Sequence, residues 1–378
     1  MDNFSNELTL TEYYADHSSK VSDKWSIYLP TYQALFAPYR DRPVRLLEIG
    51  VQNGGDLEIW AQYFKSATTI VGCDINPACA KLRYDDPRIH IVIGDANTDN
   101  TEQLIAAQSE GFDLIIDDGS HESGDIIQSF ARYFPRLSQG GLFVAEDLHC
   151  SYWSQFEGGL FNPQSSMAFF KRLADVLNHE HWGVPFARAD ILRSFEADHD
   201  IQLIESVLAE IHSVQFINSM CVISKRAEAD NVLGPRVVAG ETANVDSEPL
   251  AERGSLSIPP DQRLNSWSAP LPRPETERQL WKHLEAAQRK VDEQSLRIAE
   301  LHKSLLTEQE ISHSQSAKID ELERAAATLQ AETDAKNAQV NEILRSTSWR
   351  ASAPIRWAGL QLRRVLSTER TPTTAFRP

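Results

Sequence analysis

The sequence predicts an α/β fold, in which a doubly wound, mostly parallel sheet ends in an antiparallel hairpin and is followed by a linker and a long coiled-coil helix. Two observations support this prediction. Between residues 44 and 150, short apolar runs rich in β-branched residues alternate with stretches of helical periodicity, a pattern typical of parallel strands joined by helices. Residues 280–345 hold a single heptad register instead.

Residues 1–43 precede the first strand, and we predict an N-terminal helical segment there. Apolar residues recur at helical spacing between Tyr28 and Phe36. A polar loop with one aromatic residue, Ser22–Trp25, comes before this helix. We expect the loop to be either a solvated turn or a lid that folds over the edge of the sheet. Residues 44–226 form the predicted α/β domain.

The first predicted strand ends in a glycine turn suited to the close approach of a ligand. The segment RLLEIGVQNGG places Glu48, Gly50 and Gly54 at the junction between strand and helix. Glycines at a first strand–helix turn let the backbone approach a ligand. The pattern E-x-G-x-x-x-G lacks the middle glycine of the dinucleotide fingerprint, and the sequence has no phosphate-binding Gly-Lys-Ser/Thr motif.

Acidic residues also end the next three predicted strands. Asp74 follows the second strand, where a carboxylate can accept hydrogen bonds from both hydroxyls of a ribose. Asp95 ends the third strand, a position that suits the exocyclic amine of an adenine, and Asp117 ends the fourth. Because parallel strands present their carboxyl ends at one edge, these acids together indicate a nucleoside site more strongly than any one alone.

Two clusters of acids and histidines follow the fourth and fifth strands. Their members are Asp117, Asp118 and His121 in FDLIIDDGSH, and Glu146, Asp147 and His149 in GGLFVAEDLH. A simple alternative is that these are turn residues and a helix cap. Two such clusters in neighbouring units instead favour a site for a hard cation, which can bind hydroxyl oxygens and promote loss of a proton. His121 is the candidate general base.

The aromatic residues after the second cluster, Tyr152 and Trp153, either stack on a sugar face or belong to the core. Further along, two strands are predicted at Ile211–Phe216 and Met220–Ser224, joined by a short connection, and they form the hairpin that closes the sheet.

Residues 227–273 are rich in Pro, Ser, Asn and charge, and they are a predicted flexible linker. In the predicted coiled coil of residues 274–345, thirteen of the nineteen a and d positions are apolar, and the polar ones cluster at 308–315. An amphipathic helix folding back on its own domain is the alternative. Residues 346–378 form a basic tail containing Trp and Arg. The tail suits a membrane surface or a docking peptide for a partner equally well.

Charge and composition exclude several classes of function. The 378-residue chain has a net charge of −17, and residues 1–226 carry 17 basic against 32 acidic residues. An acidic domain argues against nucleic-acid binding. The chain has no apolar run of the ~20 residues that a membrane span requires, and its polar N-terminus does not suggest a secretory signal. With four scattered cysteines, we expect a cytoplasmic protein with reduced thiols.

These motifs resemble those of class I S-adenosylmethionine-dependent methyltransferases, which have a Rossmann-like fold. Within this class, the similarity is strongest to the metal-dependent sugar O-methyltransferases of the macrocin and mycinamicin type. It covers roughly residues 10–225. The matching elements are Asp23–Lys24, LLEIGVQNGGDLEIW (46–60), VGCDINP (71–77), GDAN (94–97), DLIIDDGSH (113–121) and GGLFVAEDLHCSYW (140–153).

The resemblance implies cofactors and residue roles. S-adenosylmethionine would be the methyl donor, and Mg²⁺ or another divalent cation would assist. Metal ligands would be Asp118, Glu146 and Asp147, and His121 would be the base. Cofactor contacts would be Glu48, Gly50, Gly54, Asp74 and Asp95, joined by the strand-end Asp117; substrate contacts would be His149, Tyr152 and Trp153. The tail also resembles segments at the ends of bacterial surface-polysaccharide enzymes, including glycosyltransferases.

We therefore expect Mg²⁺-assisted O-methylation of a sugar hydroxyl, on a surface glycan or a glycosylated metabolite. Methylation of a catechol or other small diol is the second hypothesis, because it uses the same cation chemistry. A non-catalytic scaffold that binds the cofactor is the third. Expected partners are a sugar-containing acceptor and a second copy of the chain or another coiled-coil protein. Through the tail, an assembly complex or the inner face of the membrane would be a further partner.

Overall fold

The computed structural model describes residues 8–268 and 275–367, and the side chains of 275–282, 285 and 365–367 are outside this description. Parts of three predicted segments therefore lie outside it: residues 1–7 of the N-terminal segment, 269–273 of the linker and 368–378 of the tail. The same holds for the side chain of Leu280, a predicted heptad position. The chain divides into two compact units, residues 1–271 and 272–378.

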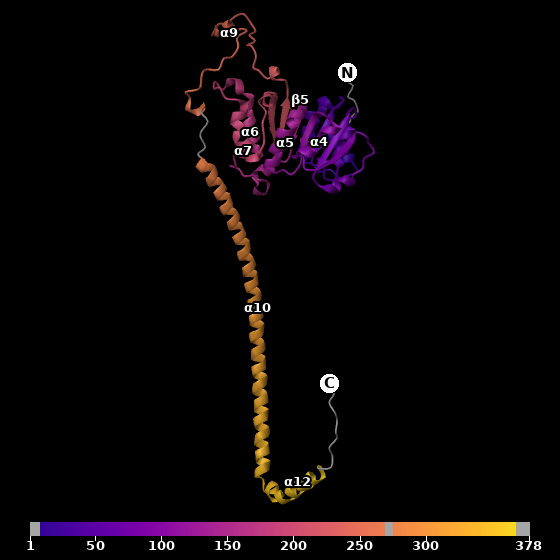
Figure 1. Cartoon of the computed structure of the whole chain (residues 1–378), viewed down its shortest axis with the longest axis vertical. Helices are drawn as coiled ribbons and strands as arrows, with labels where there is room; N and C mark the ends of the chain where they lie inside the picture. Colours follow the sequence, from indigo (N-terminus) through magenta and orange to yellow (C-terminus); the bar gives the residue numbers. More distant parts are fainter. Residues whose placement is uncertain (1–7, 269–274, 368–378) are drawn as a thin grey trace. The chain divides into compact units, whose positions relative to one another are not determined.

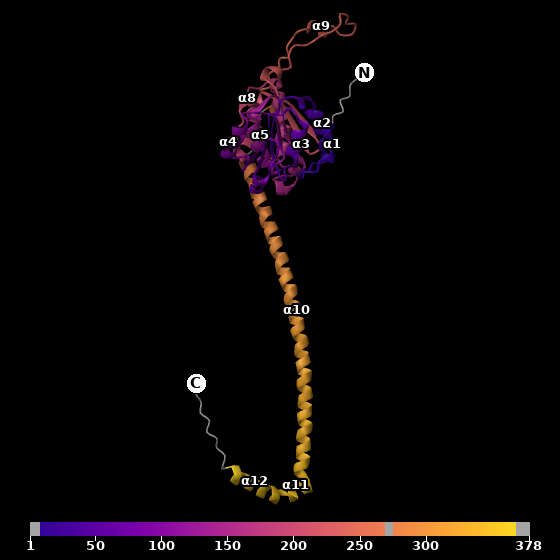
Figure 2. The same cartoon turned by 90° about the vertical axis from the view of Figure 1, so that its right-hand side faces the viewer.

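The first unit is built on one seven-stranded sheet with the strand order β3-β2-β1-β4-β5-β7-β6. Helices lie around this sheet (Figures 1 and 2). Strands β1 to β5 pair in parallel, whereas β7 is antiparallel to both β5 and β6. The predicted Rossmann-like sheet with its C-terminal hairpin is confirmed. The strands are β1 Arg45–Ile49, β2 Thr69–Asp74, β3 Ile89–Ile93, β4 Phe112–Asp117, β5 Leu137–Ala145, β6 Ile211–Ile217 and β7 Met220–Lys225.

Helices cover both faces of the sheet, because its central strands are apolar on both sides. One face packs against three helices near the N-terminus, with Tyr32, Phe36 and Trp60 at its centre. These helices are α1 Leu10–Asp16, α2 Tyr28–Phe36 and α3 Gly55–Tyr63. The opposite face packs against four helices, α4 Asp99–Gln108, α5 Ser123–Tyr133, α6 Ser166–Leu177 and α7 Arg193–His199.

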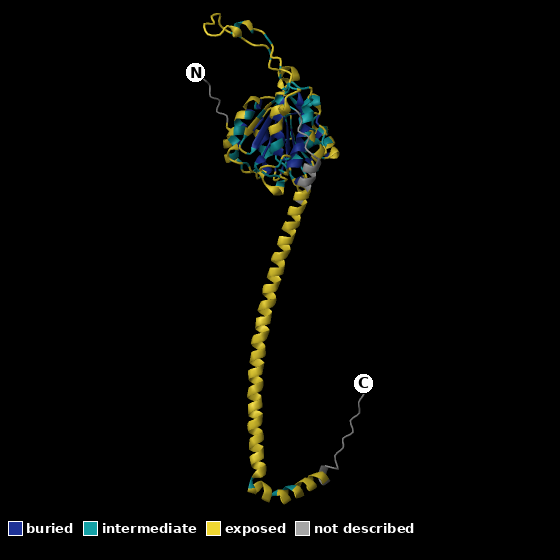
Figure 3. Cartoon of the chain, turned by 90° about the vertical axis from the view of Figure 1, so that its left-hand side faces the viewer, coloured by how far each residue is buried: buried dark blue, intermediate teal, exposed yellow. Residues whose placement is uncertain are grey.

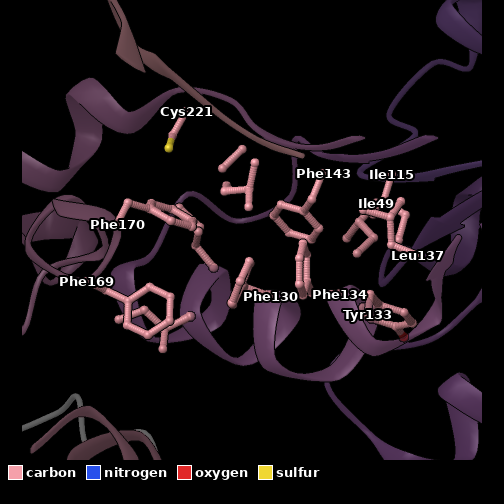
Figure 4. Packing of buried hydrophobic residues seen from close by; sticks show 14 of the residues in the cluster. Ile49, Ile115, Phe130, Tyr133, Phe134, Leu137, Phe143, Phe169, Phe170 and Cys221 are labelled. Carbon is pink, nitrogen blue, oxygen red and sulfur yellow. The ribbon is translucent and has the colours of Figure 1, made fainter. Parts of the chain in front are cut away.

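A cluster of phenylalanines fills the second face (Figure 4). Phe130 of α5 makes edge-to-face contacts with Phe143 of β5 and with Phe169 and Phe170 of α6. All four side chains are 0–1% exposed. This packing fixes α5 and α6 beside β4 and β5, the strands that lead into the two acidic clusters.

Some local structure differs from the expectation. The N-terminal segment contains an irregular stretch between α1 and α2, where backbone and side-chain contacts to α3 replace helical hydrogen bonds. Between β5 and β6 the chain forms short 3-10 turns, such as Leu148–Tyr152, together with α7 and the short helix α8 Glu205–Leu208. These pieces have no apolar periodicity long enough to be read from the sequence.

Residues 227–268 contain little regular structure beyond the short helix α9 Glu248–Ala251. In the second unit, α10 runs without a break from Glu275 to Arg345, and α11 Thr347–Ala351 and α12 Ala353–Ser367 follow it. Every described side chain of α10 is exposed, in contrast to the buried strands of the first unit (Figure 3). Among the described helices, none has the length and apolar character that crossing a bilayer requires.

Candidate active site

The carboxyl edge of the sheet brings the predicted acidic residues together. Strand β4 lies between β1 and β5, with Asp117 paired to Ile49 on one side and to Ala145 on the other. The residues that follow, Asp118 and Glu146, therefore leave neighbouring strands at the same level. Backbone hydrogen bonds hold this arrangement, since the Asp118 N–H donates to the Ile49 carbonyl at 2.9 Å and the Glu146 N–H to the Asp117 carbonyl at 2.9 Å.

Gly50 allows the ends of β1 and β4 to meet. Its φ is +92°, and a Cβ atom there would lie 1.9 Å from the carbonyl oxygen of Asp118. Any side chain would both collide with this backbone and strain its own. Gly54, on the same turn, has a φ of +82°, and a Cβ would lie 2.0 Å from the Tyr84 hydroxyl oxygen. The predicted glycine turn is thus a place where chain segments approach each other closely.

A lysine from the N-terminal segment enters this edge and lies among four carboxylates. The Lys24 Nζ atom is 2.9 Å from Glu146 Oε1 and also hydrogen-bonds to Asp118 Oδ2. Glu48 Oε1 and Asp56 Oδ2 are each 3.8 Å away. The Lys24 side chain is only 1% exposed. The loop Ser22–Trp25 is therefore not simply a solvated turn, because its lysine is buried in the acidic cluster.

Burial and mutual repulsion raise the pKa values of the glutamates in this cluster. Desolvation raises the pKa of Glu146 to about 8, although the ammonium of Lys24 and the hydroxyl of Tyr32 oppose the shift. Burial and the charge of Asp56 raise the pKa of Glu48 well above its usual value. Desolvation by itself lowers the pKa of Lys24, but the surrounding carboxylates, Glu146 first, raise it well above its ordinary value. The cluster therefore attracts cations strongly.

Asp147 follows Glu146 at the same edge and lies near two histidines. Its Oδ1 atom accepts hydrogen bonds from the Tyr28 hydroxyl at 2.7 Å and the Trp25 Nε1 at 3.1 Å. Its Oδ2 atom is 3.8 Å from His121 Nε2, and its Oδ1 is 4.0 Å from His149 Nδ1. Asp147 and His121 both have a positive φ, 52° and 61°. Strained backbone of this kind often marks a ligand site.

Two groups of potential metal ligands converge at the edge. Asp118, His121 and Asp147 form one group, and Glu48, Asp56 and Asp118 form the other; in each, the ligand atoms lie within 4.8 Å of one another. Glu146 belongs to neither group, and its carboxylate contacts Lys24 and the Tyr32 hydroxyl. The structure thus brings two of the three predicted metal ligands together with His121, and it places the third beside Lys24.

The predicted nucleoside contacts lie around the glycine turn. Asp74 Oδ2 accepts hydrogen bonds from the backbone N–H groups of Val51 and Gln52, at 2.9 and 2.8 Å, so this carboxylate also orders the turn. Asp95 Oδ1 accepts from the N–H of Asn97 at 2.9 Å. Asp117 is 4% exposed, and burial raises its pKa to about 7. One of its carboxylate oxygens has no hydrogen-bond partner among the described residues.

The aromatic residues at the edge are exposed, not part of the core. Tyr152 is 41%, Trp153 46% and Trp25 59% exposed. His149 links the last two, since its ring makes edge-to-face contacts with both Trp25 and Trp153, at centroid distances of 5.9 and 4.9 Å. These side chains form an aromatic rim beside Asp147.

The sequence analysis did not assign the residues that reach the acids from the N-terminal segment. Lys24 and Tyr32 bind Glu146, while Tyr28 binds Asp147. Tyr28 and Tyr32, four residues apart, lie on one face of α2, whereas Lys24 precedes the helix and no spacing in the sequence indicates its position. Their partners are more than 90 residues away in the chain, so only the fold pairs them.

A comparison with family models matches residues 47–148 to a family described as "Methyltransferase domain". This segment is a methyltransferase domain. It runs from Leu47 within β1 to Leu148 just after β5, and it includes the glycine turn and both acidic clusters up to Leu148. His149 and the aromatic residues that follow lie outside the match.

Curated relatives of the methyltransferase domain are enzymes named for sugar O-methylation. The chain is 40% identical over 171 residues to the 8-demethyl-8-alpha-L-rhamnosyl tetracenomycin-C 2'-O-methyltransferase of Streptomyces olivaceus, covering 43% of this chain and 44% of that protein. It is 37% identical over 164 residues to the mycinamicin VI 2''-O-methyltransferase of Micromonospora griseorubida, covering 40% of each. The chain therefore spans less than half the length of these relatives.

Among solved structures, the methyltransferase MycE from the mycinamycin biosynthetic pathway, in complex with Mg and SAH, is 26% identical to this chain. The match covers 65% of this chain and 59% of that one, with a TM-score of 0.49.

Proposed function

We propose that the methyltransferase domain transfers a methyl group from S-adenosylmethionine to a sugar hydroxyl, with the help of a divalent cation. The observation that carries this proposal is the convergence of Asp118, Asp147 and His121 within 4.8 Å, at the strand edge that also holds the glycine turn. The curated relatives, named as sugar O-methyltransferases, support the choice of acceptor.

The donor atoms of the edge fit a hard divalent cation. They are mostly carboxylate oxygens, the ligands that Mg²⁺ prefers. Both carboxylate oxygens of Glu48 are buried and lack a hydrogen-bond partner among the described residues, an arrangement that favours a nearby cation. Asp118 and Asp147 would hold the ion, with Glu146 as the third predicted ligand. When bound, the cation would stabilise a developing alkoxide on the acceptor.

His121 would accept the proton of the acceptor hydroxyl at Nε2. This atom lies 3.8 Å from Asp147 Oδ2, so the carboxylate stabilises the imidazolium that forms. The ring is held by a backbone with positive φ and lies against Phe156, at a centroid distance of 6.3 Å. A fixed base close to the ligand group is what deprotonation of a weakly acidic hydroxyl requires.

The cofactor would bind beside the glycine turn. Gly50 and Gly54 allow the tight turn that lines this place, and Asp74 and Asp95 follow or end β2 and β3 for the ribose and the adenine. Tyr152 and Trp153 of the aromatic rim would cover the sugar of the acceptor. A surface glycan or a glycosylated metabolite presents such a sugar.

The test is methyl transfer by the full chain from labelled S-adenosylmethionine to rhamnosyl glycosides and to catechol. We expect methylation of the sugar that stops in EDTA and returns with Mg²⁺. Replacing His121 by Ala should lower kcat by about 10²- to 10⁴-fold. A matched His212→Ala variant should keep full activity, because His212 lies on β6 and contacts Asn231. Unchanged turnover in EDTA would refute the role of the cation, and methylation of catechol alone would favour the small-diol hypothesis.

We further propose that α10 pairs in parallel with α10 of a second copy. Its a positions include β-branched Val291, Ile298, Ile319 and Val340, and its d positions include Leu301, Leu322 and Leu329. This combination favours two parallel strands. Lys318 at g and Glu323 at e would then face each other across the two helices with opposite charge. These apolar side chains are 52–63% exposed in the single chain, so pairing would cover them.

The basic tail after α10 supports contact with an anionic lipid surface. Residues 346–364 contain four arginines and no acidic residue. In α12 the apolar side chains of Ile355 and Leu362 are 75% and 65% exposed. A basic helix with an apolar face is suited to lie at a membrane surface.

A further inference from the structure

Lys24 occupies the position among the acidic residues where a cation is expected. Its Nζ atom hydrogen-bonds to Asp118 and lies 2.9 Å from Glu146, although the side chain is almost completely buried. Both carboxylates are predicted metal ligands. Asp118 is also the one residue shared by the two groups of converging ligand atoms. The lysine and a divalent cation would therefore use the same oxygen atoms.

One ammonium group carries too little positive charge to neutralise the four carboxylates around it. Glu48, Asp56, Asp118 and Glu146 all lie within 3.8 Å of Lys24 Nζ. The two oxygens of Glu48 are nevertheless without a hydrogen-bond partner in the described part of the chain. Buried carboxylates are normally paired or bound to a metal. The site therefore has enough negative charge, and enough carboxylate oxygens without a partner, to bind a divalent cation.

The segment that carries Lys24 is anchored mainly to the start of α3. The Gly55 N–H donates to the Val21 carbonyl at 3.0 Å. Beside this bond, Ser22 hydrogen-bonds to Asp56 and Lys20 pairs with Glu58. At its other end, Trp25 reaches Asp147. Lys24 is the link in the middle, because it joins the segment to the ends of β4 and β5.

We propose that Lys24 and the divalent cation are alternative counterions for Asp118 and Glu146, an inference that rests on the proposed metal function. In the metal-free protein the ammonium holds residues 17–27 against the strand ends. When the cation binds, like-charge repulsion and competition for the same lone pairs displace the ammonium, so the segment loosens. Lys24 is therefore a positioning residue that couples cation binding to the opening of the N-terminal segment.

Manganese binding and hydrogen exchange test this coupling without any methyl transfer. The probe is Mn²⁺ alone, measured by calorimetry and by the electron paramagnetic resonance signal of the free ion. We expect Lys24→Met to bind Mn²⁺ roughly tenfold more tightly than the wild type, a factor typical of coupling between two ligands. Lys24→Arg, which keeps the charge, should bind as the wild type does.

Lys20→Met is the matched control, since Lys20 lies on the same segment but pairs with Glu58 outside the acidic cluster. Its affinity for Mn²⁺ should not change. In the wild type, Mn²⁺ should accelerate amide exchange in residues 17–27. In Lys24→Met, exchange there should already be fast without the metal.

Two results would overturn the proposal. The first is Mn²⁺ binding by the wild type that leaves the exchange of residues 17–27 unchanged or slows it, a measurement that needs no variant. The second is a folded Lys24→Met variant that binds Mn²⁺ no more tightly than the wild type. Either result would leave the proposed metal function intact. Absence of Mn²⁺ binding in all of these proteins would refute the metal function as well.

Discussion

Gly50 shows how one residue can allow the ends of two strands to meet. Its positive φ and its contact with the backbone of Asp118 join the turn after β1 to the first acid after β4. The proposed cofactor turn and the proposed cation site therefore depend on the same missing Cβ atom.

Replacing Gly50 by Ala should destabilise the domain and separate these two sites. A left-handed conformation alone costs a non-glycine residue about 1–2 kcal/mol, and the collision with the Asp118 carbonyl adds to it. Gly140→Ala is the control, because Gly140 has a φ of +80° but nothing within 4 Å of the added atom. Thermal denaturation should show a larger decrease in melting temperature for Gly50→Ala than for Gly140→Ala. Equal decreases would mean that the contact with Asp118 does not contribute to stability.

The acids of the site were predictable from the sequence, whereas their side-chain partners Lys24 and Tyr32 were not. Asp74, Asp95 and Asp118 follow apolar runs that read as strands, and parallel strands bring such residues to one edge. Lys24 and Tyr32 reach the same edge from a segment whose position depends on packing between α2 and the sheet. No local pattern states that a lysine in a polar loop will be buried.

At the level of elements, periodicity accounts for what could be predicted. The five parallel strands and the hairpin β6–β7 were found because they are short apolar runs of β-branched residues. The 3-10 turns after β5 were missed because residues 148–156 hold their shape through local backbone hydrogen bonds and contacts with Ser219. Helix α10 was recognisable from its heptads, although all of its described side chains are exposed in the single chain.

Pairing of α10 can be tested by breaking its apolar seam. A variant with Ile319→Asp and Leu322→Asp should be monomeric in light scattering, because it buries four charges in a two-stranded coiled coil. Leu296→Asp is the matched control, since Leu296 is 70% exposed and lies at an f position away from the seam. It should remain a dimer. A monomeric wild type at tens of micromolar would contradict the proposed pairing.

For the whole molecule, charge is distributed unevenly along the chain. The net charge of the chain is −17, yet the only charged residues in the segment 346–364 are four arginines. An anionic lipid surface would repel the methyltransferase domain while attracting the tail. We therefore expect α12, and not the acidic domain, to be the part of the chain that contacts lipid.

Vesicle sedimentation tests this anchoring. The full chain should bind vesicles containing phosphatidylglycerol and should not bind neutral phosphatidylcholine. Arg363→Ala with Arg364→Ala should weaken binding by about 2 kcal/mol, or roughly 30-fold, at ~1 kcal/mol per basic residue. Gln361→Ala on the same helix should have no effect. Equal binding to neutral vesicles, or none to anionic ones, would contradict the proposal and favour a protein partner for the tail.

The four cysteines are all buried free thiols. Cys73, for example, lies in β2, and burial raises the pKa of its thiol to about 12. An alkylating reagent can therefore reach a sulfur atom only when the surrounding structure opens. The rate at which the intact protein reacts with such a reagent would therefore measure how often the fold opens, and no introduced cysteine is needed. Slower uptake with cofactor present would report binding even before an acceptor is known.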